Sequence, residues 1–125
     1  MNLSKLTTLL VVDSIEACLP TWKAVGYSVR VKVPETGTLD FVILVSASGE
    51  LMLQTKKSLK EDLPGVAQLN PTHLLYADVK SLSSAKKALE AARVIVAERT
   101  TFYGAKEAWL ELEGGAVLGL SEHAR

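Results

Sequence analysis

The chain repeats one structural pattern twice, and this repeat constrains the fold more than any other feature of the sequence. A predicted strand over 6–12 is followed by a predicted helix over 14–25, and a second strand over 72–79 by a helix over about 83–92. A shift of 67 residues, the distance from Val12 to Val79, superposes the apolar positions of the two copies. The matched pairs are Val12 with Val79, Ile15 with Leu82, Cys18 with Ala85, Trp22 with Leu89, Tyr27 with Val94 and Val29 with Val96. A duplicated strand–helix unit in so short a chain leaves few possible folds.

Each copy continues with three more strands. They are predicted over 27–33, 39–45 and 50–56 in the first copy, and over 94–99, 106–112 and 116–121 in the second. Between the copies, 57–71 is charged and contains Pro64, Gly65 and Pro71, which predicts a short helical turn and a linker. Pro20 is expected to kink the first helix or to leave its start as a loose turn.

These elements predict one α+β domain over 1–125, built from two βαβββ modules in tandem. We place module one at about 4–57, the linker at about 58–71 and module two at about 72–121. If a helix covers one face of each half-sheet, the opposite faces form a central trough in a curved mixed sheet. Alternation along the strands assigns side chains to that trough. They are Thr7, Leu9, Val11, Glu50, Met52, Gln54, Leu74, Tyr76, Asp78, Val117, Gly119 and Ser121. The same rule places Tyr27, Val29, Val31 and Val33 together on one face.

Composition excludes several classes of function. Fourteen basic and fourteen acidic residues give a formal net charge of zero, whereas nucleic-acid binding needs a basic face. No apolar run is long enough to span a membrane, and the N-terminus lacks the apolar core of a signal peptide. A single cysteine, Cys18, excludes an internal disulfide. We therefore expect a cytoplasmic protein that binds neither nucleic acid nor membrane.

Three stretches resemble the vicinal oxygen chelate superfamily of glyoxalases, bleomycin-resistance proteins, extradiol dioxygenases and fosfomycin-resistance enzymes. They are Leu-Leu-Val-Val-Asp-Ser-Ile-Glu-Ala from Leu9, Trp-Lys-Ala-Val-Gly-Tyr from Trp22, and Thr-Thr-Phe-Tyr-Gly-Ala-Lys-Glu from Thr100, the last continuing to a hairpin near Gly115. The resemblance covers nearly the whole chain. It implies the paired-module trough and a homodimer whose second chain completes or flanks it.

Enzymes of that superfamily bind a divalent metal through a His near the start of each module's first strand and a Glu late in a module's last strand. Transferred to this sequence, the positions fall on Thr7, Leu74, Gln54 and Gly119. None of these is a strong metal ligand. The sequence therefore predicts no metal, no other cofactor and no catalytic residue.

His73 leaves an alternative open. It precedes Leu74, and a slip of one residue would turn it into the trough. Even then, it would supply one ligand of the three or four that a site needs. A partly exposed residue at a strand start is the simpler interpretation. His123, near the chain end, is a poorer candidate.

Two further residues near the trough could contact a ligand. Tyr103 lies in an aromatic loop at 100–104, and Glu107 follows it at the trough rim. Glu107 could bind a cation or act as a base, although a salt bridge is the simpler role. We interpret Cys18, Trp22 and Trp109 as core residues. The predicted ligand-binding set is Thr7, Leu9, Val11, Met52, Gln54, Leu74, Tyr76, Asp78, Tyr103, Glu107, Val117 and Gly119.

This mostly apolar set predicts a small-molecule site. We expect a metal-free binding protein, resembling the bleomycin-resistance branch, that sequesters a mostly apolar and in part cationic ligand such as an antibiotic. Two alternatives stay open. One is a metal-dependent lyase, isomerase or dioxygenase that uses His73, and the other is a diverged module kept only for dimerisation.

Overall fold

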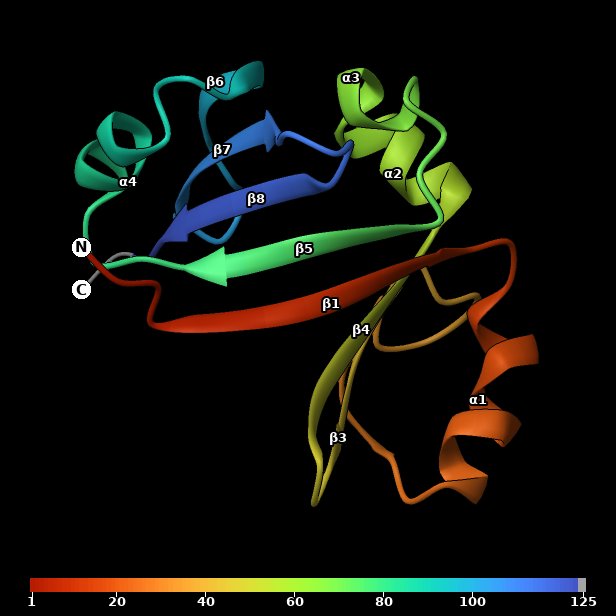
Figure 1. The fold of residues 1–125 in the computed structure, drawn as a ribbon. Coiled ribbons are helices and arrows are strands. Elements are labelled where there is room, and N and C mark those ends of the chain that lie inside the picture. Colours follow the sequence, from red (N-terminus) through yellow and green to blue (C-terminus); the bar gives the residue numbers. More distant parts are fainter. Residues whose placement is uncertain (124–125) are drawn as a thin grey trace. The chain divides into compact units, whose positions relative to one another are not determined.

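The computed structural model describes residues 1–123, which form eight strands and four helices (Figure 1). In chain order they are β1 Lys5–Val12, α1 Ile15–Ala24, β2 Ser28–Val33, β3 Phe41–Ser46, β4 Gly49–Thr55, α2 Lys56–Asp62, α3 Pro64–Ala67, β5 His73–Asp78, α4 Leu82–Ala88, β6 Arg93–Thr100, β7 Lys106–Glu111 and β8 Val117–Glu122. The predicted α+β class with two βαβββ repeats is confirmed.

The chain divides into two compact units. The α1 unit is Thr8–His73, and the α4 unit is Met1–Thr7 together with the chain from Leu74 onwards. In the α1 unit the strand order is β2-β3-β4-β1, and in the α4 unit it is β6-β7-β8-β5. In both, three strands run antiparallel and the first strand of the repeat pairs in parallel with the last. The two units therefore have the same topology.

Both repeats begin their helix in the same way. Ser14 and Ser81 adopt extended backbone, and the side-chain oxygen of each accepts a hydrogen bond from the N–H three residues later, at 3.2 Å in both cases. Such a cap satisfies a donor that the first turn leaves unpaired. The caps stand at the same 67-residue spacing as the apolar repeat.

Each helix covers one face of its own half-sheet, as the alternation predicted. In the α1 unit, Ile15 packs on Leu44 and Leu53, and Trp22 meets Tyr27 edge to face with 5.5 Å between ring centroids. In the α4 unit, Leu82 and Ala85 belong to a core with Ala77, Ala108 and Leu120. Figure 1 shows α1 on one side of β3 and β4. We call the face turned away from the helix the distal face of each unit.

A β-bulge corrects the prediction for the second strand. The register of β2 on β3 shifts between Val29 and Val31, so Arg30 is an extra residue. Val29 pairs with Leu44 and packs in the core, whereas Val31 pairs with Ile43 on the distal face. The four apolar side chains from Tyr27 to Val33 therefore do not share a face. The bulge brings two exposed valines, Val31 and Val33, to the distal side of this edge strand.

The equivalent strand of the second repeat carries the same irregularity. In β6 the register shifts between Val94 and Val96. The two bulges stand 65 residues apart, because α4 is shorter than α1. In strand register Val94 takes the place of Val29, so the predicted matches of Val29 with Val96 and of Tyr27 with Val94 are both wrong in three dimensions.

Three other predictions need correction. The segment predicted as a turn and linker forms two helices, α2 and α3, and α2 begins at an N-cap in which Thr55 accepts the Ser58 N–H. Pro20 lies inside an uninterrupted α1. The second helix ends at Ala88, four residues before the predicted end. No helix within residues 1–123 is long and apolar enough to cross a membrane.

Candidate functional site

The distal faces carry the side chains that the sequence assigned to a binding site. In the α1 unit, Leu9 pairs with Met52 and Val11 with Gln54. In the α4 unit, Tyr76 pairs with Gly119. The other six predicted residues also belong to the α4 unit: Thr7, Leu74, Asp78, Tyr103, Glu107 and Val117. The structure thus brings four predicted residues together in one unit and the rest in the other.

A buried carboxylate organises the distal face of the α4 unit. Glu107 on β7 is only 2% exposed. Its Oε1 accepts hydrogen bonds from Arg99 Nε at 3.0 Å, from Arg99 Nη2 at 2.8 Å and from Trp109 Nε1 at 2.6 Å. Its Oε2 accepts the hydroxyl of Tyr76 at 2.5 Å. These bonds offset the cost of burying the charge.

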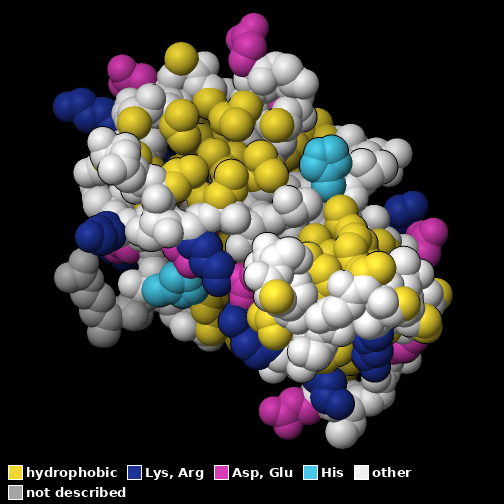
Figure 2. All heavy atoms as spheres, turned by 60° about the horizontal axis from the view of Figure 1, so that its bottom comes forward, with side chains coloured by type: hydrophobic (Ala, Val, Ile, Leu, Met, Phe, Trp, Pro, Cys, Tyr) yellow, Lys and Arg dark blue, Asp and Glu magenta, His cyan; other side chains and the backbone are white. Residues whose placement is uncertain are grey.

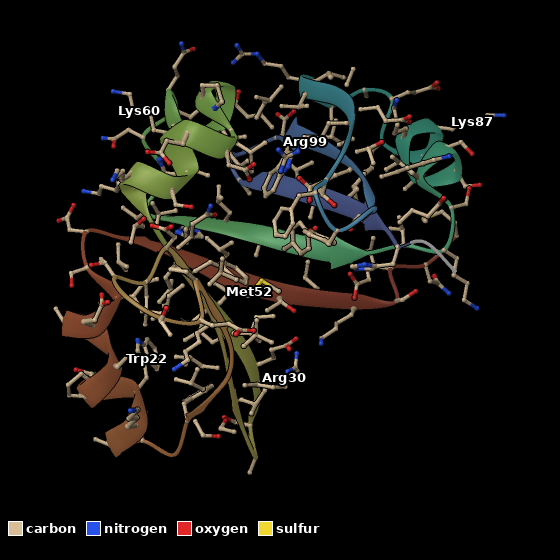
Figure 3. All side chains as sticks on the ribbon, turned by 180° about the vertical axis from the view of Figure 1, so that it is seen from behind. Trp22, Arg30, Met52, Lys60, Lys87 and Arg99 are labelled. Atoms are coloured by element: carbon tan, nitrogen blue, oxygen red, sulfur yellow. The ribbon has the colours of Figure 1, made fainter. Side chains whose placement is uncertain are left out.

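The positions of these partners follow from strand geometry. Arg99 on β6 lies directly opposite Glu107, and Trp109 follows Glu107 by two residues on the same face. Tyr76 reaches the cluster from β5. Figure 3 shows Arg99 among the side chains of this half-sheet. We call Tyr76, Arg99, Tyr103, Glu107 and Trp109 the Glu107 cluster.

Tyr103 extends the cluster toward solvent. Its hydroxyl lies 3.0 Å from that of Tyr76, and the residue is 51% exposed. Burial raises the pKa of Tyr76 well above its usual range, and the nearby charge of Glu107 raises it further. Burial also raises the pKa of Tyr103. Both hydroxyls therefore stay protonated at neutral pH and can donate one hydrogen bond each.

Two aromatic rings close over Gly119. A Cβ at position 119 would lie 2.7 Å from carbons of the Trp109 indole, which is too close for any real side chain. Trp109 is Gly119's cross-strand partner on β7, and Tyr76 is its partner on β5. The two rings lie 5.8 Å apart and are tilted by 36°. Only glycine fits beneath this pair. Trp109 is buried, as predicted for a core residue, and it lies on the distal face.

His123 adds a polar rim to the same face. Its Nε2 lies 3.0 Å from Asp78 Oδ1, and its ring stacks on Tyr103 with 6.2 Å between centroids. Phe102 meets Tyr103 edge to face at 5.1 Å and is 92% exposed. Apolar and aromatic surface is therefore open to solvent beside the hydroxyl of Tyr103.

The distal face of the α1 unit combines apolar and polar side chains. Figure 3 shows Met52 and Arg30 on the side of the strands away from Trp22. Arg30, the bulge residue, forms an ion pair with Glu50. The Nε2 of buried Gln54 donates to Ser58 Oγ at 3.0 Å. A pocket of about 150 Å³ in the same unit is lined by Val11, Lys56, Leu59, Lys60, Ala67, Asn70 and Pro71.

Charges of both signs are interspersed on the surface in Figure 2, with hydrophobic side chains gathered between them. This mixture of signs is seen on the one face that Figure 2 draws. It agrees with the zero formal net charge of the chain.

No family model and no curated protein matches this sequence. Solved structures match along almost the whole chain. A glyoxalase/bleomycin resistance protein/dioxygenase superfamily member from Vibrio splendidus 12B01 has a TM-score of 0.71 at 14% identity, and the match covers 94% of this chain and 97% of that one. Methylmalonyl-CoA epimerase from Mycobacterium tuberculosis has a TM-score of 0.68 at 13% identity, with 98% and 90% covered. A hypothetical protein from Bacillus halodurans C-125 has a TM-score of 0.71 at 16% identity, with 99% and 95% covered.

The chain has the vicinal oxygen chelate fold. The expectation that the resemblance raised about the fold is therefore confirmed. At these identities the structural likeness establishes the fold and not an activity.

The residues at the metal positions of the vicinal oxygen chelate fold do not suit a metal. Leu74 is buried and apolar, Gly119 has no side chain, and Gln54 is engaged with Ser58. Within residues 1–123, no three His, Cys, Asp or Glu side chains are grouped so that they could hold a metal ion. His73 is exposed, with Nδ1 3.2 Å from Thr72 Oγ1, and β5 pairs regularly with β8 from Leu75 to Asp78. The slip that would turn His73 onto the distal face is not present.

Sequence reasoning missed three contacts: the pairing of Arg99 with Glu107, the hydrogen bond from Trp109 to Glu107, and the contact of His123 with Asp78. Arg99 carried a usable signal, because an arginine opposite a glutamate across a hairpin forms a cross-strand pair. The bulge in β6 hid that register. His123 had no signal, since its partner lies 45 residues earlier.

Proposed function

We propose that this protein binds a small, mostly apolar and in part cationic molecule without a metal, in the manner of the bleomycin-resistance branch. An antibiotic is one ligand of this type. The ligand would be held by stacking and hydrogen bonds on the distal faces, with no bond made or broken. Of the predicted ligand-binding set, Met52, Tyr76, Asp78 and Tyr103 are at least partly exposed and are the proposed ligand contacts, while the other members are buried.

The relationship between Trp109 and Gly119 carries this proposal. The late-strand position, where the resemblance places a metal-binding Glu, lies under an indole ring that excludes any side chain. The buried Glu107, two residues before Trp109 on β7, already accepts four hydrogen bonds. A carboxylate in that state has little capacity left to bind a metal or to act as a base. These contacts favour a binding role over Lewis-acid catalysis.

The remaining distal side chains support a small-molecule site. In the α4 unit, the ring of Tyr76, the hydroxyl of Tyr103 and the imidazole of His123 offer aromatic surface with a few polar contacts. In the α1 unit, the partly exposed side chain of Met52 offers apolar surface. Apolar walls with a few placed polar groups are typical of ligand pockets.

A thermal-shift screen of cationic, neutral and anionic amphiphiles tests the proposal. A compound that binds only the folded protein must raise its melting temperature. We expect at least one hit whose shift is reduced by Met52→Ala or Tyr76→Phe and retained by Val25→Ala, an exposed residue at the end of α1. No stabilising compound at all would favour a module kept only for dimerisation.

Metal analysis tests the alternative. Protein incubated with nickel, manganese, zinc or iron and then desalted should retain no stoichiometric metal. One tightly bound equivalent that disappears in His73→Ala would establish the metal-dependent class instead.

We also propose a homodimer. β2 is an edge strand with two exposed valines, Val31 and Val33, each 38% exposed, and the zero net charge gives little repulsion between copies. Light scattering at micromolar concentration should give twice the chain mass, and a monomer would contradict the proposal.

A further inference from the structure

Three oxygen groups in the α4 unit form a chain from the surface to a buried charge. The Tyr103 hydroxyl lies 3.0 Å from the Tyr76 hydroxyl, and the Tyr76 hydroxyl donates to Glu107 Oε2 at 2.5 Å. Tyr103 is about half exposed, while Glu107 is almost completely buried. The chain therefore connects solvent with a carboxylate that is fixed within the sheet.

The buried end sets the direction of every hydrogen bond in this chain. Arg99 and Trp109 donate to Oε1 of Glu107 and Tyr76 donates to Oε2, so both carboxylate oxygens act as acceptors. Tyr76 has one proton, which it donates to Oε2. The Tyr76 oxygen can then only accept a hydrogen bond from Tyr103. The Tyr103 hydroxyl therefore uses its one proton in the bond to Tyr76.

The exposed end is therefore an acceptor. The Tyr103 oxygen has no proton left to donate, but it retains lone pairs. The Thr101 hydroxyl is within hydrogen-bonding reach of the Tyr103 oxygen and can occupy one of its two lone pairs. The other lone pair can accept a hydrogen bond from a further donor. The ring that carries this oxygen meets Phe102 edge to face and stacks on the imidazole of His123, so the oxygen belongs to a cluster of three rings.

We propose that the Tyr103 oxygen is the polar contact of an amine-recognition site, which selects a protonated amine carried on an aromatic or apolar body. The ammonium N–H groups would donate to this oxygen, and the body would pack on the exposed rings of Phe102 and Tyr103. Rings of this kind also attract cations through their faces. This inference rests on the proposed binding function and specifies the chemistry that the site accepts.

The test compares three probes that share one ring. Benzylammonium has N–H donors, benzyltrimethylammonium has the same charge without donors, and benzoate offers only acceptors. Amide shifts of Gly104 and Ala105 and the fluorescence of Trp109 follow binding to the intact protein. We expect benzylammonium to bind about tenfold more tightly than benzyltrimethylammonium, the effect of one hydrogen bond to a charged group.

Two variants separate the effect of the hydrogen-bond chain from simple stacking of the probe on the aromatic rings. Tyr103→Phe removes the acceptor and keeps the ring, so the two cations should bind equally. Tyr76→Phe removes the partner that consumes the Tyr103 proton, so Tyr103 can donate and the preference for benzylammonium over benzoate should narrow about tenfold. Tyr27→Phe is the matched control, because the Tyr27 hydroxyl lies 3.4 Å from Ser48 in the other unit, and it should change neither ratio.

Equal binding of the two cations to the unaltered protein would overturn the inference, as would a preference for benzylammonium over benzoate that Tyr76→Phe leaves unchanged. Failure of all three probes to bind at this loop would overturn it too. None of these results would contradict the proposed binding function if the thermal-shift screen yields a ligand whose stabilising shift is reduced by Met52→Ala. Tyr103→Phe keeps the inference testable should Tyr76→Phe not fold, since residue 103 is exposed.

Discussion

Trp109 covers Gly119 so closely that a methyl group at position 119 would lie 2.7 Å from the indole carbons. Gly119→Ala should therefore destabilise the protein by about 1–3 kcal/mol, the usual cost of overpacking a filled site. Chemical denaturation measures this loss. The loss should shrink in a Trp109→Phe background, because the smaller ring leaves space for the added methyl. An identical loss in both backgrounds would show that the two residues do not interact.

Glu107 should be the most important charged residue for stability. Glu107→Gln removes the charge that Arg99 faces in a buried setting, and we expect a loss of about 2–4 kcal/mol. Glu111→Gln is the matched control on the same strand, where the partner Arg93 is 72% exposed in its side chain. That variant should cost less than about 1 kcal/mol. Equal losses in denaturant titrations would contradict the structural role of Glu107.

Stability should fall in alkaline solution because of Tyr76. Its pKa is raised in the folded protein, so the proton stays bound there after the unfolded chain has begun to lose it near pH 10. The contribution is intact below that pH and declines above it, by up to about 1.4 kcal/mol per pH unit for one group. Melting temperatures between pH 8 and 11 should fall less steeply in Tyr76→Phe. Tyr27→Phe should keep the full decline, and a decline independent of Tyr76 would contradict the assignment.

The two helix caps should contribute equally. Ser14→Ala and Ser81→Ala each remove a hydrogen bond of 3.2 Å to the N–H of the first helical turn. Each substitution should cost about 1 kcal/mol in free energy of unfolding. Ser84→Ala keeps the backbone N–H that donates to Ser81 and changes only the side chain, so it should cost clearly less. A marked difference between the two caps would indicate that the repeats are not energetically equivalent.

The sequence predicted which side chains share a face wherever a helix covers the opposite face. Leu10 and Val12 face α1, and Ala77 and Val79 face α4, because apolar alternation is strong in buried strands. It failed at Arg30, since a bulge between two valines leaves no mark in a pattern that is apolar on both sides of it. After Thr55 the sequence predicted only a short helical turn and a linker, because the charges and prolines of this segment hid the extent of the two helices.

The candidate site was only partly predictable. Tyr76, Tyr103 and Glu107 could be proposed from strand parity and loop position. Their mutual contacts depend on cross-strand register and on the length of the side chains across it. The sequence of one strand alone does not determine that register. Arg99 and Trp109, which determine what Glu107 can do, enter the site only through those pairings.

Native mass spectrometry of the protein, purified without denaturant, tests the central claim most directly, because it weighs the chain together with whatever it holds. The account predicts an organic adduct of small mass, from a co-purified or added ligand, and no mass increment from a metal ion. A stoichiometric metal adduct that is lost in His73→Ala, with no organic ligand bound under any condition, would contradict it.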